Sequence, residues 1–225
     1  MDEKKEELKI TASLVWSPIG FYQQIFIWLF TLSIPAVVNI VYILNPANKA
    51  GLFDWLLRVK ALFNLNHFII YVLWGLIGGA VLSFLFLLLT WLITGISGET
   101  AHERLNRNDE LIPRSPAQKR WAVLINLSAS FVEEILFRAY LFMALINVWN
   151  HWIWAAVLVS AIFAFVHTNI QQLSATIWIF ITSFFLCLFT IKLQGLAFPW
   201  GMHLSVNLMN LFIFPKLSER LFNER

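Results

Sequence analysis

Six long apolar segments constrain what this chain of 225 residues can fold into more than any other feature of its sequence. A helix needs about 20 residues to cross the hydrocarbon core of a bilayer, and each segment reaches or approaches that length. The segments cover residues 21–44, 67–95, 121–148, 152–168, 173–193 and 196–214. We therefore predict an all-α polytopic membrane protein with about six transmembrane helices.

The composition supports a location in the membrane. The chain is 59% hydrophobic and only 13% charged, whereas about a quarter of the residues in a soluble domain are charged. It also holds 11 tryptophans and 21 phenylalanines, and aromatic side chains gather at membrane–water interfaces. The only cysteine, Cys187, excludes a disulfide within the chain.

The remaining segments complete a single predicted membrane domain over residues 1–225. Residues 52–65 are too short to span and mix Asp54, Arg58 and Lys60 with large apolar residues, which suits a helix lying in the interface. Residues 96–120 form the longest polar stretch and are predicted to be a cytoplasmic loop. Residues 1–20 precede an apolar segment that is too long for a signal peptide, so we expect them to remain as a cytoplasmic N-terminal segment.

The distribution of positive charge predicts the orientation. Most of the 16 lysines and arginines lie near the N-terminus, in residues 96–120 and after residue 214. Positive charge is enriched on the cytoplasmic side of membrane proteins. The chain is therefore expected to be a multi-pass protein of the cell membrane with both termini in the cytoplasm.

Ionisable side chains inside apolar segments are costly and usually mark function. In the third segment, Glu134 and Arg138 are four residues apart, so they share a helix face and can form an ion pair. Glu133 lies about 100° around the helix from Glu134 and has no cation three or four residues away. A carboxylate in such low-dielectric surroundings can act as a base near neutral pH.

Two further polar groups lie in the fourth and sixth segments. His167 follows Phe163 by four residues, and Asn207 follows His203 by four. Each alone has an ordinary structural explanation, because a histidine at a helix end is often interfacial and an asparagine often hydrogen-bonds a neighbouring helix. Together with the acids, they supply the acid, base and amide groups needed for attack of water on a carbonyl.

These residues form three ordered motifs: E-E-x-x-x-R at 133–138, F-x-x-x-H at 163–167 and H-x-x-x-N at 203–207. In this order, on separate apolar segments, they resemble the CAAX-protease and bacteriocin-processing (CPBP, or Abi) family of intramembrane proteases. The resemblance covers residues 121–214 and implies that the last four helices form the protease core. It implies an endopeptidase that cleaves a membrane-associated or hydrophobic peptide in a cavity open to the cytoplasm.

The resemblance also implies a role for each polar residue of the motifs. Glu133 and His167 would hold and activate the attacking water, while His203 and Asn207 would stabilise the oxyanion. The Glu–Arg pair of the third segment would support the site structurally, which agrees with the spacing of its two charges.

The resemblance leaves the cofactor open, because family members have been described both as metalloproteases and as glutamate-dependent proteases. Glu133, His167 and His203 could ligate zinc and leave one coordination position free. The spacing of His203 and Asn207 favours a hydrogen-bonding pair over a ligand set, so we favour a water activated by Glu133.

Two other functions stay compatible with the sequence. One is a non-catalytic or partly catalytic scaffold on the same fold, serving bacteriocin self-immunity or membrane regulation. The other is a proton-coupled transporter, although such proteins often show two inverted halves and no such repeat is visible. The expected partners are a peptide or membrane-protein substrate and the lipid bilayer, without nucleic acid, and the oligomeric state stays open.

Overall fold

The computed structural model describes residues 14–43, 57, 60–63, 67–97, 112–167 and 173–217. Within these residues every regular element is helical, so the all-α fold class is confirmed. The elements, in chain order, are α2 (Pro18–Ile43), α4 (Phe68–Ser97), α6 (Pro116–Glu134), the π-helix η3 (Ile135–Phe142), α7 (Met143–Trp149), α8 (Trp152–His167), α9 (Leu173–Lys192), α10 (Ala197–Leu208) and the π-helix η4 (Met209–Ile213).

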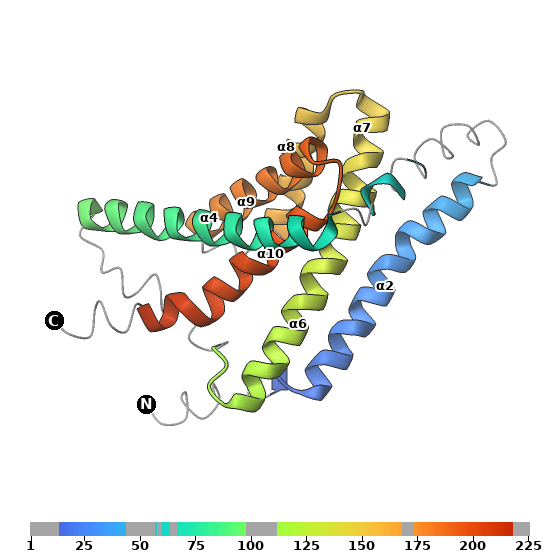
Figure 1. Ribbon diagram of the computed structural model, residues 1–225. Coiled ribbons are helices and arrows are strands. Elements are labelled where there is room, and N and C mark those ends of the chain that lie inside the picture. The colour runs from blue at the N-terminus through green and yellow to red at the C-terminus, as the bar shows by residue number, and fades with distance from the viewer. Residues whose placement is uncertain are drawn as a thin grey trace.

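Each predicted apolar segment coincides with one helix or with a run of joined helices. The third segment is the run α6–η3–α7, and the sixth is the run α10–η4. Figure 1 shows α2 running beside α6, with α4 and α10 crossing the other side of the molecule. Most of the predicted interfacial helix at 52–65 and most of the polar segment at 96–120 lie outside the described residues.

Helix α6 begins at Pro116, within the polar segment, rather than at about residue 121 as hydropathy suggested. A capping box explains the earlier start. The Ser115 hydroxyl accepts a hydrogen bond from the Gln118 backbone N–H at 3.1 Å, and the Gln118 side chain accepts one from Ser115 N–H at 2.9 Å. This exchange satisfies free donors at the helix N-terminus, and proline is favoured in the first turn.

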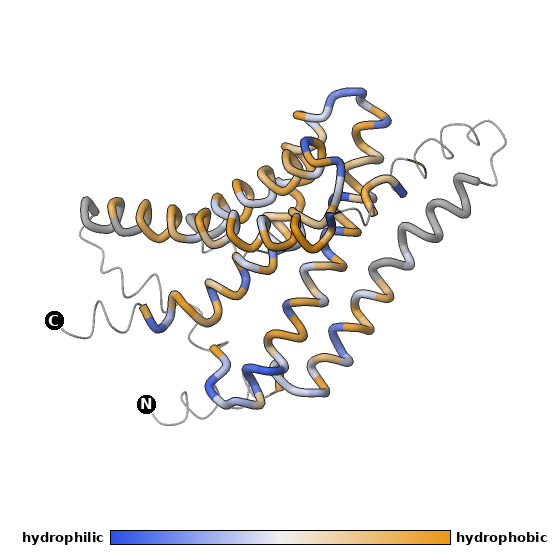
Figure 2. The backbone as a smooth tube through the Cα atoms, viewed as in Figure 1, coloured by the Kyte–Doolittle hydropathy of each residue, from blue (hydrophilic) through white to orange (hydrophobic). Residues whose placement is uncertain are grey.

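Helix α4 contains the one stretch among the described residues, Phe68–Leu89, that is long and apolar enough to cross a membrane. Only 17% of its most apolar window is buried, as expected for a helix that faces lipid, and Figure 2 shows it mostly in the hydrophobic colour. The apolar helices Trp152–His167 and Thr176–Lys192 are shorter. Six spans and cytoplasmic termini therefore stay predictions.

Glycines bring the backbones of α4 and α10 into direct contact. A Cβ added at Gly75 would lie 2.2 Å from Phe198 O, and one at Gly79 would lie 2.3 Å from Met202 O. From the opposite helix, a Cβ at Gly201 would lie 2.3 Å from the backbone of α4. Small residues at four-residue spacing permit such close approach between membrane helices. This contact fixes α4 against the helix that carries His203.

A buried apolar cluster joins η3, α7, α8 and α9. Phe142 of η3 is fully buried, and so are Ala155, Ala156 and Val159 of α8. The alanines let α8 lie close to its neighbours, because small side chains reduce the distance between helix backbones. The cluster fixes η3 and α8 relative to each other, and these two elements carry Arg138 and His167.

Replacing Gly79 with alanine is expected to destabilise the protein by about 1–3 kcal/mol, because the new methyl group overlaps the α10 backbone. Gly195→Ala is the matched control, since its Cβ would meet atoms only at 3.6 and 3.7 Å. Unfolding by sodium dodecyl sulfate in mixed micelles measures the free energy of both variants. Equal stability of the two variants would contradict the packing described for α4 and α10.

Candidate active site

The two adjacent glutamates stand where α6 passes into the π-helix η3. Glu133 and Glu134 are the last residues of α6, and η3 begins at Ile135. A second π-helix, η4, begins at Met209, just after Asn207. Short π-helical segments within α-helices are frequently found at functional sites. Hydropathy and motif spacing predicted continuous α-helices here, because they do not distinguish π-helical from α-helical turns.

Glu134 and Arg138 form a fully buried ion pair. Arg138 Nη1 lies 3.2 Å from Glu134 Oε1, and neither side chain is exposed. Arg138 Nη2 donates a hydrogen bond of 2.9 Å to Ser183 Oγ on α9. The guanidinium carbon also lies 4.6 Å from the centre of the Phe163 ring. Pairing, hydrogen bonding and the cation–π contact together offset the cost of removing the guanidinium from water.

His203 is bound directly to this ion pair. Its Nδ1 lies 2.8 Å from Glu134 Oε1. Because Glu134 is paired with Arg138, its carboxylate oxygen accepts and His203 Nδ1 donates the hydrogen bond. This bond fixes the orientation of the ring. The second ring nitrogen, Nε2, therefore faces Glu133 and lies 3.5 Å from Glu133 Oε2.

His167 approaches the same oxygen from α8. Its Nδ1 lies 2.8 Å from the Phe163 carbonyl oxygen, which can only accept, so Nδ1 carries the hydrogen. The imidazole stacks on the Phe163 ring with centroids 4.2 Å apart. Its Nε2 is thereby directed to Glu133 Oε2, at 3.4 Å. Nε2 of both imidazoles thus faces Glu133 Oε2, and each ring is oriented by a different hydrogen bond.

A cavity of about 280 Å³ opens at this point. Glu133, His167, His203 and Asn207 all line it, whereas Glu134 and Arg138 do not. The Glu133 side chain is 20% exposed and that of Glu134 is 0% exposed. The adjacent glutamates therefore occupy different environments, one in the cavity wall and one sealed behind it.

Several residues of the site lie outside the three motifs. Ser183 binds Arg138, and further polar side chains line the cavity, namely Ser83, Asn126, Thr182 and Asn210. Apolar walls come from α4 and α9, where Phe86 and Trp178 meet edge to face with centroids 4.4 Å apart. Serine, threonine and asparagine are common in membrane helices, so no pattern in the sequence singled these positions out.

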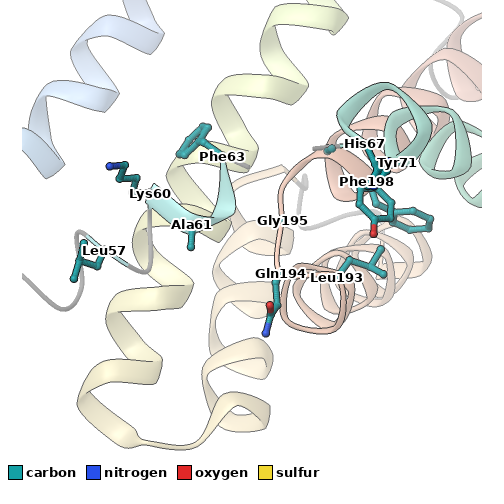
Figure 3. Close-up of a pocket in the computed structure, with 11 residues that line it drawn as sticks. Leu57, Lys60, Ala61, Phe63, His67, Tyr71, Leu193, Gln194, Gly195 and Phe198 are labelled. Carbon is teal, nitrogen blue, oxygen red and sulfur yellow. The ribbon is translucent and has the colours of Figure 1, made fainter. Parts of the chain in front are cut away.

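A larger cavity, of about 840 Å³, lies away from this site. It is lined by residues near the start of α4, by residues 57, 60, 61 and 63, and by the turn between α9 and α10. No motif residue lines it. In Figure 3 its polar side chains Lys60 and Gln194 point in different directions and not toward a common centre. The smaller cavity, where acid and base groups converge, is therefore the candidate active site.

The described residues contain no group of three or more His, Cys, Asp or Glu side chains arranged to hold a metal ion. Glu133, His167 and His203, the set that the sequence left open as zinc ligands, are among the described residues and are not found as such a group.

Arg138→Ala is expected to destabilise the protein by about 3–5 kcal/mol, because it leaves Glu134 buried without its cation. The control is Arg120→Ala, which removes an exposed arginine from the first turns of α6. The yield of folded protein and its unfolding in detergent report the difference. A variant at position 138 as stable as the control would exclude a structural role for this pair.

Comparison with known proteins agrees with the motifs. A family model described as Type II CAAX prenyl endopeptidase Rce1-like matches residues 116–209. The matched region runs from the start of α6 to the first residue of η4 and contains all seven motif residues. No curated protein and no solved structure matches the chain. The predicted resemblance is thus confirmed: residues 116–209, somewhat less than half of the chain, match the CAAX-protease family of membrane proteases.

Proposed function

We propose that the chain is an intramembrane endopeptidase that cleaves a membrane-associated or hydrophobic peptide by attack of water on the scissile carbonyl. The observation that carries this proposal is the single cavity into which Glu133, His167, His203 and Asn207 converge from three helices. The family match supports a CAAX-type protease in general. The catalytic roles below are argued from the contacts of the side chains.

Glu133 and His167 are suited to orient the attacking water. In its neutral form His167 has a lone pair on Nε2, because its hydrogen is on Nδ1. A water that contacts both this nitrogen and Glu133 Oε2 from the cavity can donate one hydrogen to each and direct an oxygen lone pair at the carbonyl carbon. As the new C–O bond forms, Glu133 takes the proton from the water as a general base.

His203 and Asn207 are suited to stabilise the oxyanion. The His203 Nδ1–H is already donated to Glu134, so donation to an oxyanion requires a second hydrogen on Nε2. Asn207 lies one helical turn from His203 in the cavity wall and supplies an amide N–H donor. Each such donor typically contributes about 100- to 1000-fold to the rate.

Collapse of the tetrahedral intermediate completes the reaction. The C–N bond breaks, and Glu133 returns the proton that it took from water to the departing amine. The same carboxyl group thus serves as base and then as acid, as one group can when the two steps are consecutive. The products are a carboxylate and an amine, and no further reactant is needed.

The cavity favours a short extended segment of substrate. Its volume of about 280 Å³ is close to the lower limit of roughly 300 Å³ for ligand pockets. Its walls combine apolar side chains such as Phe86 and Trp178 with a few hydrogen-bonding groups. Such a lining suits a hydrophobic stretch of peptide around the scissile bond rather than a folded domain.

Glu133→Gln is expected to lower the cleavage rate by at least about 100-fold, because the amide cannot take a proton from water. His167→Ala and His203→Ala should cause losses of the same order. The assay uses proteoliposomes loaded with apolar peptides, with and without a farnesylated C-terminal cysteine, and mass spectrometry of the products.

His151→Ala is the control for these variants, because His151 lies at the turn before α8 and does not line the candidate cavity. It should cleave at the rate of the unchanged protein. If Glu133→Gln and the two histidine variants give the same products at the same rate as the control, the chain is not a protease of this kind.

Metal removal separates a glutamate-activated water from a metal-bound one. We expect dialysis of the purified protein against 1,10-phenanthroline to leave the cleavage rate unchanged, because Glu133 alone can take the proton from water. Elemental analysis before and after dialysis checks the zinc content. A loss of rate that added zinc restores would instead establish a metal-dependent mechanism.

A further inference from the structure

Ser183 lies outside the three motifs but contacts their central charge. It is on α9 and is fully buried. Its hydroxyl accepts a 2.9 Å hydrogen bond from Arg138 Nη2, across 45 residues of sequence. Buried hydroxyl groups in helices often bond to the carbonyl four residues earlier, as Thr190 does with Leu186 O at 2.8 Å. The recorded hydrogen bond of Ser183 instead joins two helices.

The bond continues through the ion pair to the cavity. Arg138 is held by Ser183 on one side and by Glu134, at 3.2 Å, on the other. The same oxygen of Glu134 binds His203 Nδ1 at 2.8 Å. A short series of contacts therefore leads from α9 through η3 and α6 to an imidazole on α10 that lines the cavity.

A second route leads from Arg138 to the other imidazole. The guanidinium carbon lies 4.6 Å from the centre of the Phe163 ring. The Phe163 ring stacks with His167 at 4.2 Å and meets His203 edge to face at 5.7 Å. A displacement of the guanidinium would therefore change the positions of both imidazoles.

Ser183 supplies the hydrogen bond that sets the orientation of the guanidinium. Arg138 Nε and Nη1 make no hydrogen bond to a described residue, although Nη1 forms the ion pair. The Cys187 thiol also approaches Arg138, but a thiol is a weak acceptor. Without the Ser183 hydroxyl, the guanidinium can rotate about the Nη1–Oε1 ion pair with Glu134.

We propose that Ser183 is a positioning residue of the active site, which acts through Arg138 and Glu134 to hold His203 toward the cavity. This inference rests on the proposed function for its catalytic consequence, whereas its structural part concerns the orientation of His203 alone. Ser183 touches neither the cavity nor Glu133, so its effect should appear in catalysis and not in substrate binding.

The kinetic experiment compares Ser183→Ala with Thr190→Val in the proteoliposome assay with apolar peptides. Ser183→Ala should lower kcat by roughly 10- to 100-fold with KM nearly unchanged, since a misplacement of about 1 Å can cost about 100-fold. Thr190→Val removes another buried hydroxyl of α9, one that donates to the Leu186 carbonyl of its own helix, and it should keep the original kcat. A kcat for Ser183→Ala equal to that of Thr190→Val overturns the proposal.

A spectroscopic experiment tests the positioning without any substrate. The full chain, labelled with ¹⁵N-histidine in micelles, gives an Nδ1–H signal for His203 that is assigned by its loss in His203→Gln. Ser183→Ala should shift or broaden this signal, and Thr190→Val should leave it unchanged. An unchanged His203 signal in Ser183→Ala overturns the inference even if cleavage is confirmed. A shifted signal in a chain that cleaves no peptide supports the positioning and refutes only the proposed function.

Discussion

The buried ion pair between Glu134 and Arg138 is the interaction on which the site depends. Taking two charges out of water costs several kcal/mol per ion unless partners compensate. Here Arg138 is met by Glu134, by the Ser183 hydroxyl and by the Phe163 ring, and Glu134 is met in turn by His203. These partners come from α6, α8, α9 and α10. The need to satisfy one guanidinium thus brings four helices together and orients an imidazole of the cavity.

The adjacent glutamates face different surroundings. Successive residues of a helix point about 100° apart, so Glu134 can face the buried arginine while Glu133 faces the cavity. Glu133, the base proposed for catalysis, is therefore not the carboxylate that pairs with Arg138. Its nearest groups are His167 and His203, at 3.4 and 3.5 Å. A proton gained or lost by Glu133 would leave the Glu134–Arg138 ion pair in place.

The cavity needs more than the region that matches the protease family. Its wall includes Leu82, Ser83 and Phe86 of α4, which precedes residues 116–209. Glycine contacts hold α4 against α10, so the position of this wall follows from backbone packing rather than from the motifs. A peptide bound in the cavity, as proposed, would therefore contact α4 as well as the matched region.

From the amino-acid sequence we could predict the helical class, the approximate extent of each helix and the residues that carry charge into apolar surroundings. These are local properties, since apolar length and the spacing of Glu134 and Arg138 depend only on neighbours along one helix. The prediction from hydropathy began α6 too late, although Ser115 and Gln118 have the spacing of a capping box. Only the tertiary structure showed the π-helices, the cavity wall and the two hydrogen bonds, His203–Glu134 and Ser183–Arg138. The two bonds join residues 69 and 45 positions apart, and only packing of the helices determines which polar groups meet.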